Sequence, residues 1–403
     1  MSRADPSESR FPLGLVVWGA IGIALNVGLA RFTYGVMLPA IRRDLDLGYL
    51  GSGNLNGVHL TGYLIGTLAA PWLIARTGTA RLSRWAHLLV AAGALTCALA
   101  PESRALGSAV LGIGRFATGL GAGAGIVAIL VLVFNAVPAT LRSATSAAVW
   151  AGMGVAIVAS GFAVPLLLGP AIGWRLAFAF SALLALAFAF GFPPKTGRHE
   201  APAPALGGDG IRFSSRRLLG AGWLFLVAAY LLFGIAYVGY STFAGAQLAA
   251  MKAPTHLVGA TWIGFGVTSM VGAALTVPIA GSPHTRRFAL VAALASGAAG
   301  ALVAALDTGA AAFVGALLVG LGLAATPTFV TAFARERCTA DEYPRVFSYA
   351  SAALGIGQLI GPIASGALAD RFGTVAVPVF AAIAYGIAAS LAIADGVLTR
   401  RSK

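Results

Sequence analysis

Two arginines lie inside long apolar segments, and their chemistry suggests an anion-binding site. Arg31 is in NVGLARFTYGVMLP (26–39), and Arg115 is in GIGRFATGLGAGAG (112–125). An arginine near the centre of a bilayer costs about 2.5–3.5 kcal/mol on insertion scales, so such residues are functional by default. A guanidinium binds a carboxylate or a phosphate through two parallel, charge-assisted hydrogen bonds. The pattern therefore predicts that Arg31 and Arg115 bind an anion.

The acidic residues give neither arginine a partner at membrane depth. Backbone carbonyls and water are the alternative partners, in which case the arginines would hold helices together instead of binding a ligand. The 13 acidic residues all fall in expected tails, loops or the last turn of an apolar segment: Asp5, Glu8, Asp44, Asp46, Glu102, Glu200, Asp209, Asp307, Glu336, Asp341, Glu342, Asp370 and Asp395.

Other polar side chains in apolar segments are candidates to shape the same pocket. Tyr34 is three residues after Arg31, so both are expected on one helix face. Tyr237 is near the middle of a later segment, whereas tyrosines at the membrane interface lie near segment ends. Gln358 could bond either a ligand or a neighbouring helix. We expect the substrate-binding residues to be Arg31, Tyr34, Arg115, Tyr237, Thr242 and Gln358.

His59 is the candidate carrier of a coupling proton. Histidine is the side chain that changes charge nearest neutral pH, and His59 lies well inside an apolar segment. The alternative is a neutral, hydrogen-bonded histidine near the outer rim of the membrane.

The sequence contains no pattern typical of an enzyme. No nucleophile–base pair or metal-ligand cluster is present, and the two cysteines do not suggest a disulfide framework. The glycines at 119, 121, 123 and 125 suit close contact between membrane helices, because no strand precedes them and no P-loop lysine follows. We therefore expect a protein without catalytic residues, metal or cofactor, and without a nucleic-acid partner.

The composition is that of a membrane protein. The chain is 58% hydrophobic and only 10% charged, whereas soluble domains carry about 25% charged residues. Continuous apolarity without period-2 alternation favours helices over a barrel. We expect an all-α protein with twelve transmembrane helices, at roughly 12–40, 52–74, 85–100, 105–134, 144–170, 173–192, 219–247, 256–280, 287–306, 309–334, 346–369 and 374–398.

The basic residues set the orientation. If the N-terminus is placed inside, most of the 27 Lys and Arg residues fall in inner loops and tails, as the positive-inside rule requires. We therefore expect cytoplasmic tails at 1–11 and 399–403, two six-helix halves at 12–192 and 219–398, and a cytoplasmic linker at 193–218. The net charge of +14 is then a topology signal.

The two halves carry weak internal repeats. VGLARF (27–32) matches VGYSTF (238–243), and AAVWAGMGVAIVASG (147–161) matches AALGIGQLIGPIASG (352–366). In this alignment Arg31 corresponds to Thr242, so the fold does not require a charge at that position. Two repeated halves with a substrate site between them are typical of transporters.

Several motifs resemble those of the major facilitator superfamily (MFS). RFATGLGAG (115–123) resembles the family's arginine–glycine motif. GALADRFG (366–373) resembles its Gly-x-x-x-Asp-Arg-x-Gly signature, and PWLIARTG (71–78) is a degraded copy with Ala75 in the Asp position. The stretches ARFTYGVMLPAI, SGNLNGVHLTGYLIGTL and FGIAYVGYSTF resemble the bacterial YbfB/YjiJ-type branch. This resemblance implies an inward/outward rocking mechanism, a cavity lined by the first, fourth, seventh and tenth spans, and gating by Arg76, Gly78, Asp370 and Arg371.

Together these features predict a secondary active transporter for a small organic anion, in particular a carboxylate. It would work by alternating access as a monomer in the bacterial inner membrane, with H⁺ as the candidate coupling ion. The alternatives are an efflux pump for hydrophobic or cationic drugs and, with less support, a membrane receptor or scaffold that transports nothing.

Overall fold

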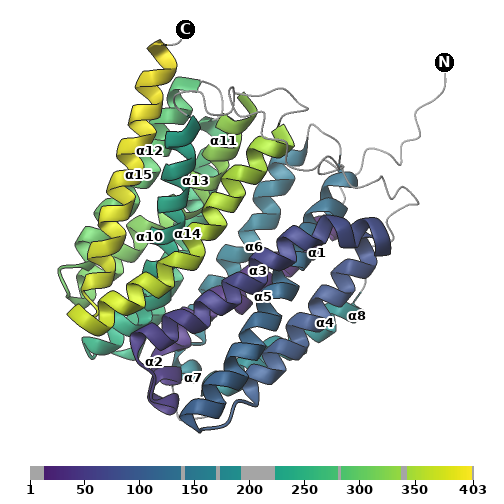
Figure 1. Ribbon diagram of the computed structural model, residues 1–403, viewed down its shortest axis with the longest axis vertical. Coiled ribbons are helices and arrows are strands. Elements are labelled where there is room, and N and C mark those ends of the chain that lie inside the picture. The colour runs from purple at the N-terminus through teal and green to yellow at the C-terminus, as the bar shows by residue number, and fades with distance from the viewer. Residues whose placement is uncertain are drawn as a thin grey trace.

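The protein is a bundle of long helices (Figure 1). The computed structural model describes residues 13–137, 141–168, 173–191, 223–279, 283–336 and 343–401, and within them all regular structure is helical. The elements are α1 (Leu13–Ile23), η2 (Ala24–Phe32), α2 (Thr33–Leu45), α3 (Tyr49–Thr77), α4 (Thr79–Ala98), α5 (Arg104–Asn135), α6 (Arg142–Phe162), α7 (Val164–Leu167), α8 (Gly173–Phe190), α10 (Trp223–Ala250), α11 (Thr255–Ile279), α12 (Pro283–Ala304), α13 (Gly309–Glu336), α14 (Tyr343–Phe372) and α15 (Ala376–Arg401).

Most of the expected spans are helices that can cross a bilayer. Eleven helical segments of the described residues are long and apolar enough to do so. The remaining expected span corresponds to α4, a helix of 20 residues. It is less apolar because Arg81, Arg84 and His87 fall in its first half. The prediction of an all-α membrane protein is confirmed.

The first span contains a π-helical segment that the sequence pattern does not predict. α1, η2 and α2 form one continuous segment of 33 residues, Leu13–Leu45. The N–H of Thr33 bonds to the carbonyl of Gly28, five residues back, and this i→i+5 bond widens the helical turn. Short π-segments occur frequently at functional sites. Here the segment carries the buried side chains of Asn26 and Arg31.

The fifth expected span, 144–170, is interrupted. α6 ends at Phe162, and the four-residue helix α7 begins at Val164 with Pro165 in its first turn. Proline has no backbone N–H and clashes with the carbonyl four residues earlier, so it is favoured at the start of a helix. The apolar run therefore continues through this point while the helix does not.

Glycines bring α5 against its neighbours. A Cβ atom at Gly119 or Gly123 would overlap the backbone carbonyl of His59 or Tyr63 in α3, and one at Gly121 would meet the carbonyl of Ala86 in α4. These glycines are thus contact points between helices, as membrane helices require. The interpretation of the glycine pattern as helix packing is confirmed.

The helices form two groups of six long helices each. α3, α4 and α5 pack together in the first group, and α10, α14 and α15 do so in the second. The groups meet where α3 crosses α14, where α2 lies against α10 and where α6 lies beside α11 (Figure 1). Residues 193–218, the expected linker, and the expected tails except 399–401 lie outside the described residues.

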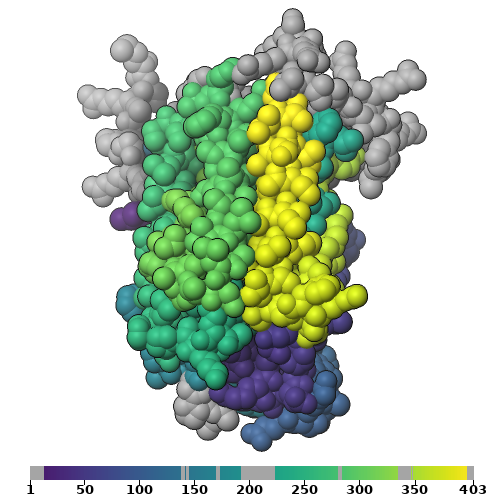
Figure 2. Space-filling view, turned by 90° about the vertical axis from the view of Figure 1, so that its left-hand side faces the viewer, coloured from purple at the N-terminus to yellow at the C-terminus, as the bar shows by residue number. Residues whose placement is uncertain are grey.

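One end of this contact is lined by glycines, which we call the glycine seam: Gly53, Gly245 and Gly366. A Cβ atom at Gly53 would overlap the carbonyl oxygen of Pro362, and one at Gly245 would lie 2.6 Å from the carbonyl oxygen of Gly35. The seam is at the end of the bundle opposite α15's C-terminus. In Figure 2 the purple segment of the first half lies directly below the green and yellow helices of the second.

Candidate functional site

Arg31 lies between the two halves. Its side chain is buried, at 8% exposure, and its Nη2 donates a hydrogen bond of 2.7 Å to the hydroxyl of Tyr237 in α10. The rings of Phe32, Tyr63 and Tyr237 surround the guanidinium, with centroids 5.4–6.0 Å from Cζ. Arg31 therefore has one neutral hydrogen-bond partner and an aromatic surround.

A small cavity adjoins this arginine. Its volume is about 10 Å³, which is the lower limit for holding one water molecule. Three polar side chains besides Arg31 line it, and both halves contribute. The lining residues are Arg31, Phe32, Gly35 and Asn56 from the first half, and Val238, Ser241 and Thr242 from the second.

Tyr237 joins Arg31 to Gln358. The Nε2 of Gln358 in α14 lies 2.7 Å from the same hydroxyl and donates to it. A guanidinium has no acceptor, so the oxygen of Tyr237 must accept from Arg31. Three of the expected pocket residues therefore form one cluster across the interface between the halves.

Arg115 is held differently from Arg31. It is fully buried, at 0% exposure, and its Nη1 donates to the carbonyl of Ala30 at 2.6 Å while its Nη2 donates to Oδ1 of Asn56 at 2.7 Å. The ring of Tyr34 covers its face, 4.4 Å from Cζ. Arg115 is not among the residues that line the central cavity.

Neither arginine has a carboxylate partner within the described parts of the chain. The acidic residues seen in ion pairs there are Asp44, Asp46 and Asp395. Asp395 is buried, at 2% exposure, and pairs with Arg287 at 3.3 Å. It lies in the last turn of the candidate span Ala376–Gly396, as expected.

Tyr34 and His59 both contact Arg115. The hydroxyl of Tyr34 donates to the carbonyl of Ser52 at 2.9 Å, so its ring is held against Arg115. His59 Nδ1 lies 3.2 Å from the carbonyl oxygen of Arg115 and 3.2 Å from Oγ1 of Thr118. His59 is fully buried and ten residues into α3, about 15 Å from the helix end, so it does not lie at the rim.

Asn56 and Ser241 are site residues that our set of candidates omits. Asn56 bonds Arg115 through Oδ1 and donates from Nδ2 to Oγ1 of Thr242 at 2.7 Å. The available signal was its spacing, since Asn56 is three residues before His59 on the same helix. Ser241 lies beside Thr242 and gave no separate signal.

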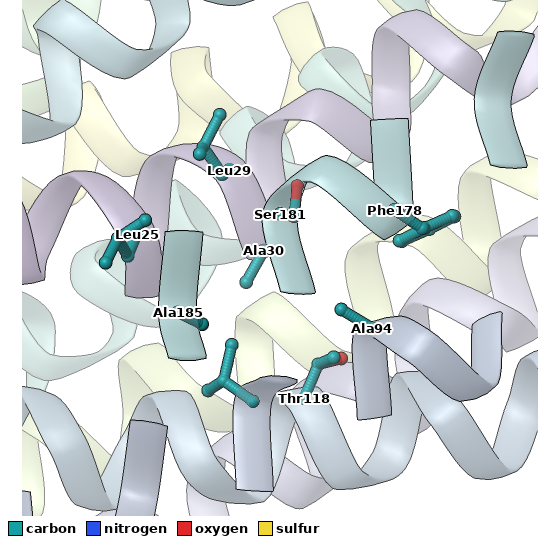
Figure 3. A pocket seen from close by; sticks show the side chains of 9 residues that line it. Leu25, Leu29, Ala30, Ala94, Thr118, Phe178, Ser181 and Ala185 are labelled. Atoms are coloured by element: carbon teal, nitrogen blue, oxygen red, sulfur yellow. The ribbon is translucent and has the colours of Figure 1, made fainter. Parts of the chain in front are cut away.

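A second small cavity, also of about 10 Å³, lies within the first half (Figure 3). Its two hydroxyl groups are already bonded, from Thr118 to the carbonyl of Arg115 and from Ser181 to the carbonyl of Ala177. With no charged residue in its lining, it does not resemble a site for an ion. The lining residues are Leu25, Leu29, Ala30, Val90, Ala94, Thr118, Phe178, Ser181 and Ala185.

Comparison with known proteins decides the family. The model of the family described as "Uncharacterised MFS-type transporter YbfB" matches residues 23–396. The chain belongs to the major facilitator superfamily. The fold of this MFS protein is similar to a structure titled "Crystal Structure of A Bacterial Homolog to Human Lysosomal Transporter, Spinster, in Inward-facing And Occupied Conformation", with a TM-score of 0.71, 14% sequence identity and 98% of both chains covered. No curated protein matches the sequence.

Family membership sets the general function. The protein is a multi-pass membrane transporter and not an enzyme. The similarity to the MFS and to its YbfB-type branch is confirmed, as is the all-α class. The bounds of the two halves, 12–192 and 219–398, stay a prediction.

The two copies of the MFS signature differ in this transporter. Gly78 and Gly373 share a backbone φ of 82°, so the two copies turn alike although Ala75 replaces the acid in one. Arg76 stacks on the ring of Trp72 at 4.0 Å. Arg371 lies over the ring of Phe372, 5.3 Å from its centroid.

Asp370, in the complete copy, caps a helix of the other half. Its two carboxylate oxygens accept the backbone N–H groups of Tyr49 and Leu50 at 2.7 and 2.8 Å. These are the first residues of α3, and an N-terminal turn carries unpaired N–H groups and a partial positive charge. Gly48 leaves room for this contact, because a Cβ there would lie 3.2 Å from Asp370.

Proposed function

We propose that the protein is a secondary active transporter for a small organic anion, in particular a carboxylate. The observation that carries this proposal is Arg31, a buried cation that lines a cavity between the two halves and has one neutral hydrogen-bond partner. A buried charge without a counter-charge is costly. A carboxylate in the cavity would supply that counter-charge and a pair of charge-assisted hydrogen bonds.

The polar groups near the cavity favour an anion over a cation. Arg31 has only donors, and Asn56 directs its Nδ2 donor toward the second half. Arg115 adds a second positive charge behind Asn56. A cationic substrate would meet like charges here and no carboxylate among the described residues, so the drug-efflux alternative has less support.

We assign direct contact with the anion to Arg31, Thr242 and Gln358. Tyr237 is the neutral partner that Arg31 exchanges for the anion, and Arg115 and Tyr34 have a supporting role. Arg31 and Thr242 line the cavity, and Tyr237 and Gln358 bond next to it. The cavity has room for about one water molecule. A substrate would therefore enter when the halves move apart, in agreement with alternating access.

H⁺ is our candidate coupling ion and His59 its candidate carrier. Protonation of His59 would place a second cation beside Arg115, whose carbonyl its Nδ1 contacts. Coupling through His59 therefore requires the two residues to separate during the cycle. We also propose cytoplasmic termini, on the basis of the distribution of basic residues. A monomer in the bacterial inner membrane is proposed from the resemblance to the YbfB-type branch.

Thermal unfolding of the purified protein tests the proposed substrate class. A bound ligand stabilises the folded state by about 2.7 kcal/mol at 100 times its Kd. We expect lactate, succinate or benzoate to raise the melting temperature of the wild type, and tetraphenylphosphonium not to. Arg31→Gln should raise the Kd for the anion at least about tenfold and so reduce this stabilisation, since a hydrogen bond to a charged group contributes about 1.5–3 kcal/mol.

Arg104→Gln is the matched control, because Arg104 is exposed and pairs with the exposed Asp46. Stabilisation by tetraphenylphosphonium alone would support an efflux pump for cations and would overturn the proposal. Equal anion binding by wild type and Arg31→Gln would remove Arg31 from the site.

A further inference from the structure

A chain of hydrogen bonds runs from Arg115 into the second half. Nη2 of Arg115 donates to Oδ1 of Asn56 at 2.7 Å, Nδ2 of Asn56 donates to Oγ1 of Thr242 at 2.7 Å, and that hydroxyl donates to the carbonyl of Val238 at 2.6 Å. Arg115, Asn56 and Thr242 are each at most 3% exposed. This series of hydrogen bonds therefore connects α5, α3 and α10 in a buried environment.

Arg115 fixes the direction of every bond in this chain. A guanidinium can only donate, and an amide can present either its oxygen or its nitrogen. The oxygen of Asn56 must therefore face Arg115, which leaves its nitrogen to face Thr242. The hydroxyl of Thr242 then accepts from Asn56 and directs its hydrogen to Val238. Without Arg115 the amide of Asn56 could turn over and present an acceptor.

We propose that Arg115 is a positioning residue that makes the site selective for anions by holding Asn56 with its donor toward the second half. This inference rests on the proposed function and divides the work between the two buried arginines. Arg31 contacts the anion, whereas Arg115 acts on it through Asn56. Asn56 lines the cavity and Arg115 does not. The orientation of the Asn56 amide therefore decides whether this side of the cavity presents a hydrogen-bond donor or an acceptor.

The surroundings of Arg115 support an indirect role. Both terminal nitrogens already have protein acceptors, the carbonyl of Ala30 and Oδ1 of Asn56. The ring of Tyr34 covers the guanidinium, and a hydrogen bond to Ser52 holds that ring in place. A substrate that approached the face of the guanidinium would have to displace this ring. Arg31 has a single neutral partner to exchange.

A double-mutant cycle distinguishes positioning from direct binding. Wild type, Arg115→Gln, Asn56→Ala and the double variant are titrated with lactate, succinate and benzoate, and Kd is taken from the concentration dependence of the melting temperature. If Arg115 acts through Asn56, Arg115→Gln weakens binding at least about tenfold alone, and at most about twofold further once Asn56 is alanine. A direct contact gives losses that multiply, and that result would overturn the inference.

A second variant covers the case in which Arg115→Gln does not fold. Asn56→Asp keeps an acceptor for Arg115 and replaces the donor toward Thr242 with another acceptor, to which the threonine hydroxyl can donate. We expect it to fold and to lose anion binding at least about tenfold. Asn54→Asp is the control, because Asn54 is on the same helix and exposed.

The outcomes distinguish failure of the positioning role from failure of the proposed function. Wild-type affinity in Asn56→Asp would overturn the positioning role and leave the anion site intact. If none of the three carboxylates stabilises the wild type, the proposed function fails, and the inference that rests on it fails with it.

Discussion

The two halves meet in two regions of opposite character. At the centre of the interface, long polar side chains face each other: Arg31 and Asn56 from one half, Tyr237 and Thr242 from the other. At the glycine seam, backbone lies against backbone, and one carboxylate, Asp370, caps the first turn of α3. The centre contains a cavity next to these polar groups.

This difference separates the tasks of binding and closure. Long side chains can exchange a protein partner for a ligand by rotating, at a modest cost in rotamer freedom. A contact between glycine backbones has no side chain that can rotate, so the contact is either closed or open. We therefore expect changes at the centre to alter affinity, and changes at the seam to alter which end of the transporter is open.

The largest effect is expected from a side chain in the seam. Gly53→Val places a branched side chain where even a Cβ would overlap the carbonyl of Pro362. Overpacking of this kind costs about 1–3 kcal/mol, so the closed seam should become about 5- to 150-fold less populated and transport should fall accordingly. Distances between spin labels on the exposed Leu99 and Leu306 should lengthen.

Gly51→Val is the control for this prediction, since a Cβ at Gly51 would have only the side chain of Leu47 within 4 Å, at 3.9 Å. An unchanged label distance in Gly53→Val would show that the seam does not limit opening.

A smaller effect is expected at the centre from Tyr237→Phe. The change removes the oxygen that accepts from both Arg31 and Gln358. Leaving a buried donor unpaired costs about 1–3 kcal/mol, so the melting temperature without ligand should fall by a few degrees. If an anion replaces Tyr237 as the partner of Arg31, added benzoate should then stabilise this variant more than the wild type. Equal stabilisation would show that Arg31 keeps Tyr237 when anions bind. Tyr240→Phe, on the same helix, controls for loss of a tyrosine hydroxyl.

The sequence predicted the spans more fully than the contacts made by their polar residues. Apolar runs and the glycines of α5 report burial directly, so the helical class and the close helix packing could be predicted. The π-segment could not. Its i→i+5 bond ends on the carbonyl of Gly28, and Gly28 lies close against Ala156 of α6, a contact that the sequence does not reveal. That segment, in turn, is part of what determines which way Arg31 faces.

The site shows the same limit. Arg31 and Arg115 were identified as buried charges, but a helix turns about 100° per residue, so sequence spacing alone does not tell which one lines the cavity. Tyr34 was expected beside Arg31 and contacts Arg115 instead. Asn56 was missed because its importance comes from bonds to two other helices.

An effect of about 1 kcal/mol is expected from Asp370→Asn. The amide keeps one oxygen and loses the negative charge, so one of the two N–H groups of α3 loses its acceptor. Capping interactions of this kind contribute about 0.5–2 kcal/mol. The population with an open seam should rise about fivefold, measured with the same spin labels. Asp46→Asn is the control, because the side chain of Asp46 is 88% exposed and pairs with the exposed Arg104. A response equal to that of Asp46→Asn would count against a role for the cap.

The smallest effect is expected from Arg76→Ala, in the degraded copy of the signature. Arg76 stacks on the ring of Trp72, and an exposed cation–π contact contributes about 0.5–1 kcal/mol. Because Ala75 leaves no carboxylate beside it, Arg76 has no cap to stabilise, and transport should remain within about twofold of wild type. A fall in transport of about fivefold, as large as the shift in population expected from Asp370→Asn, would mean that Arg76 gates the other end of the transporter without an acidic neighbour. The asymmetry between the two signatures would then lie in their sequence alone and not in their function.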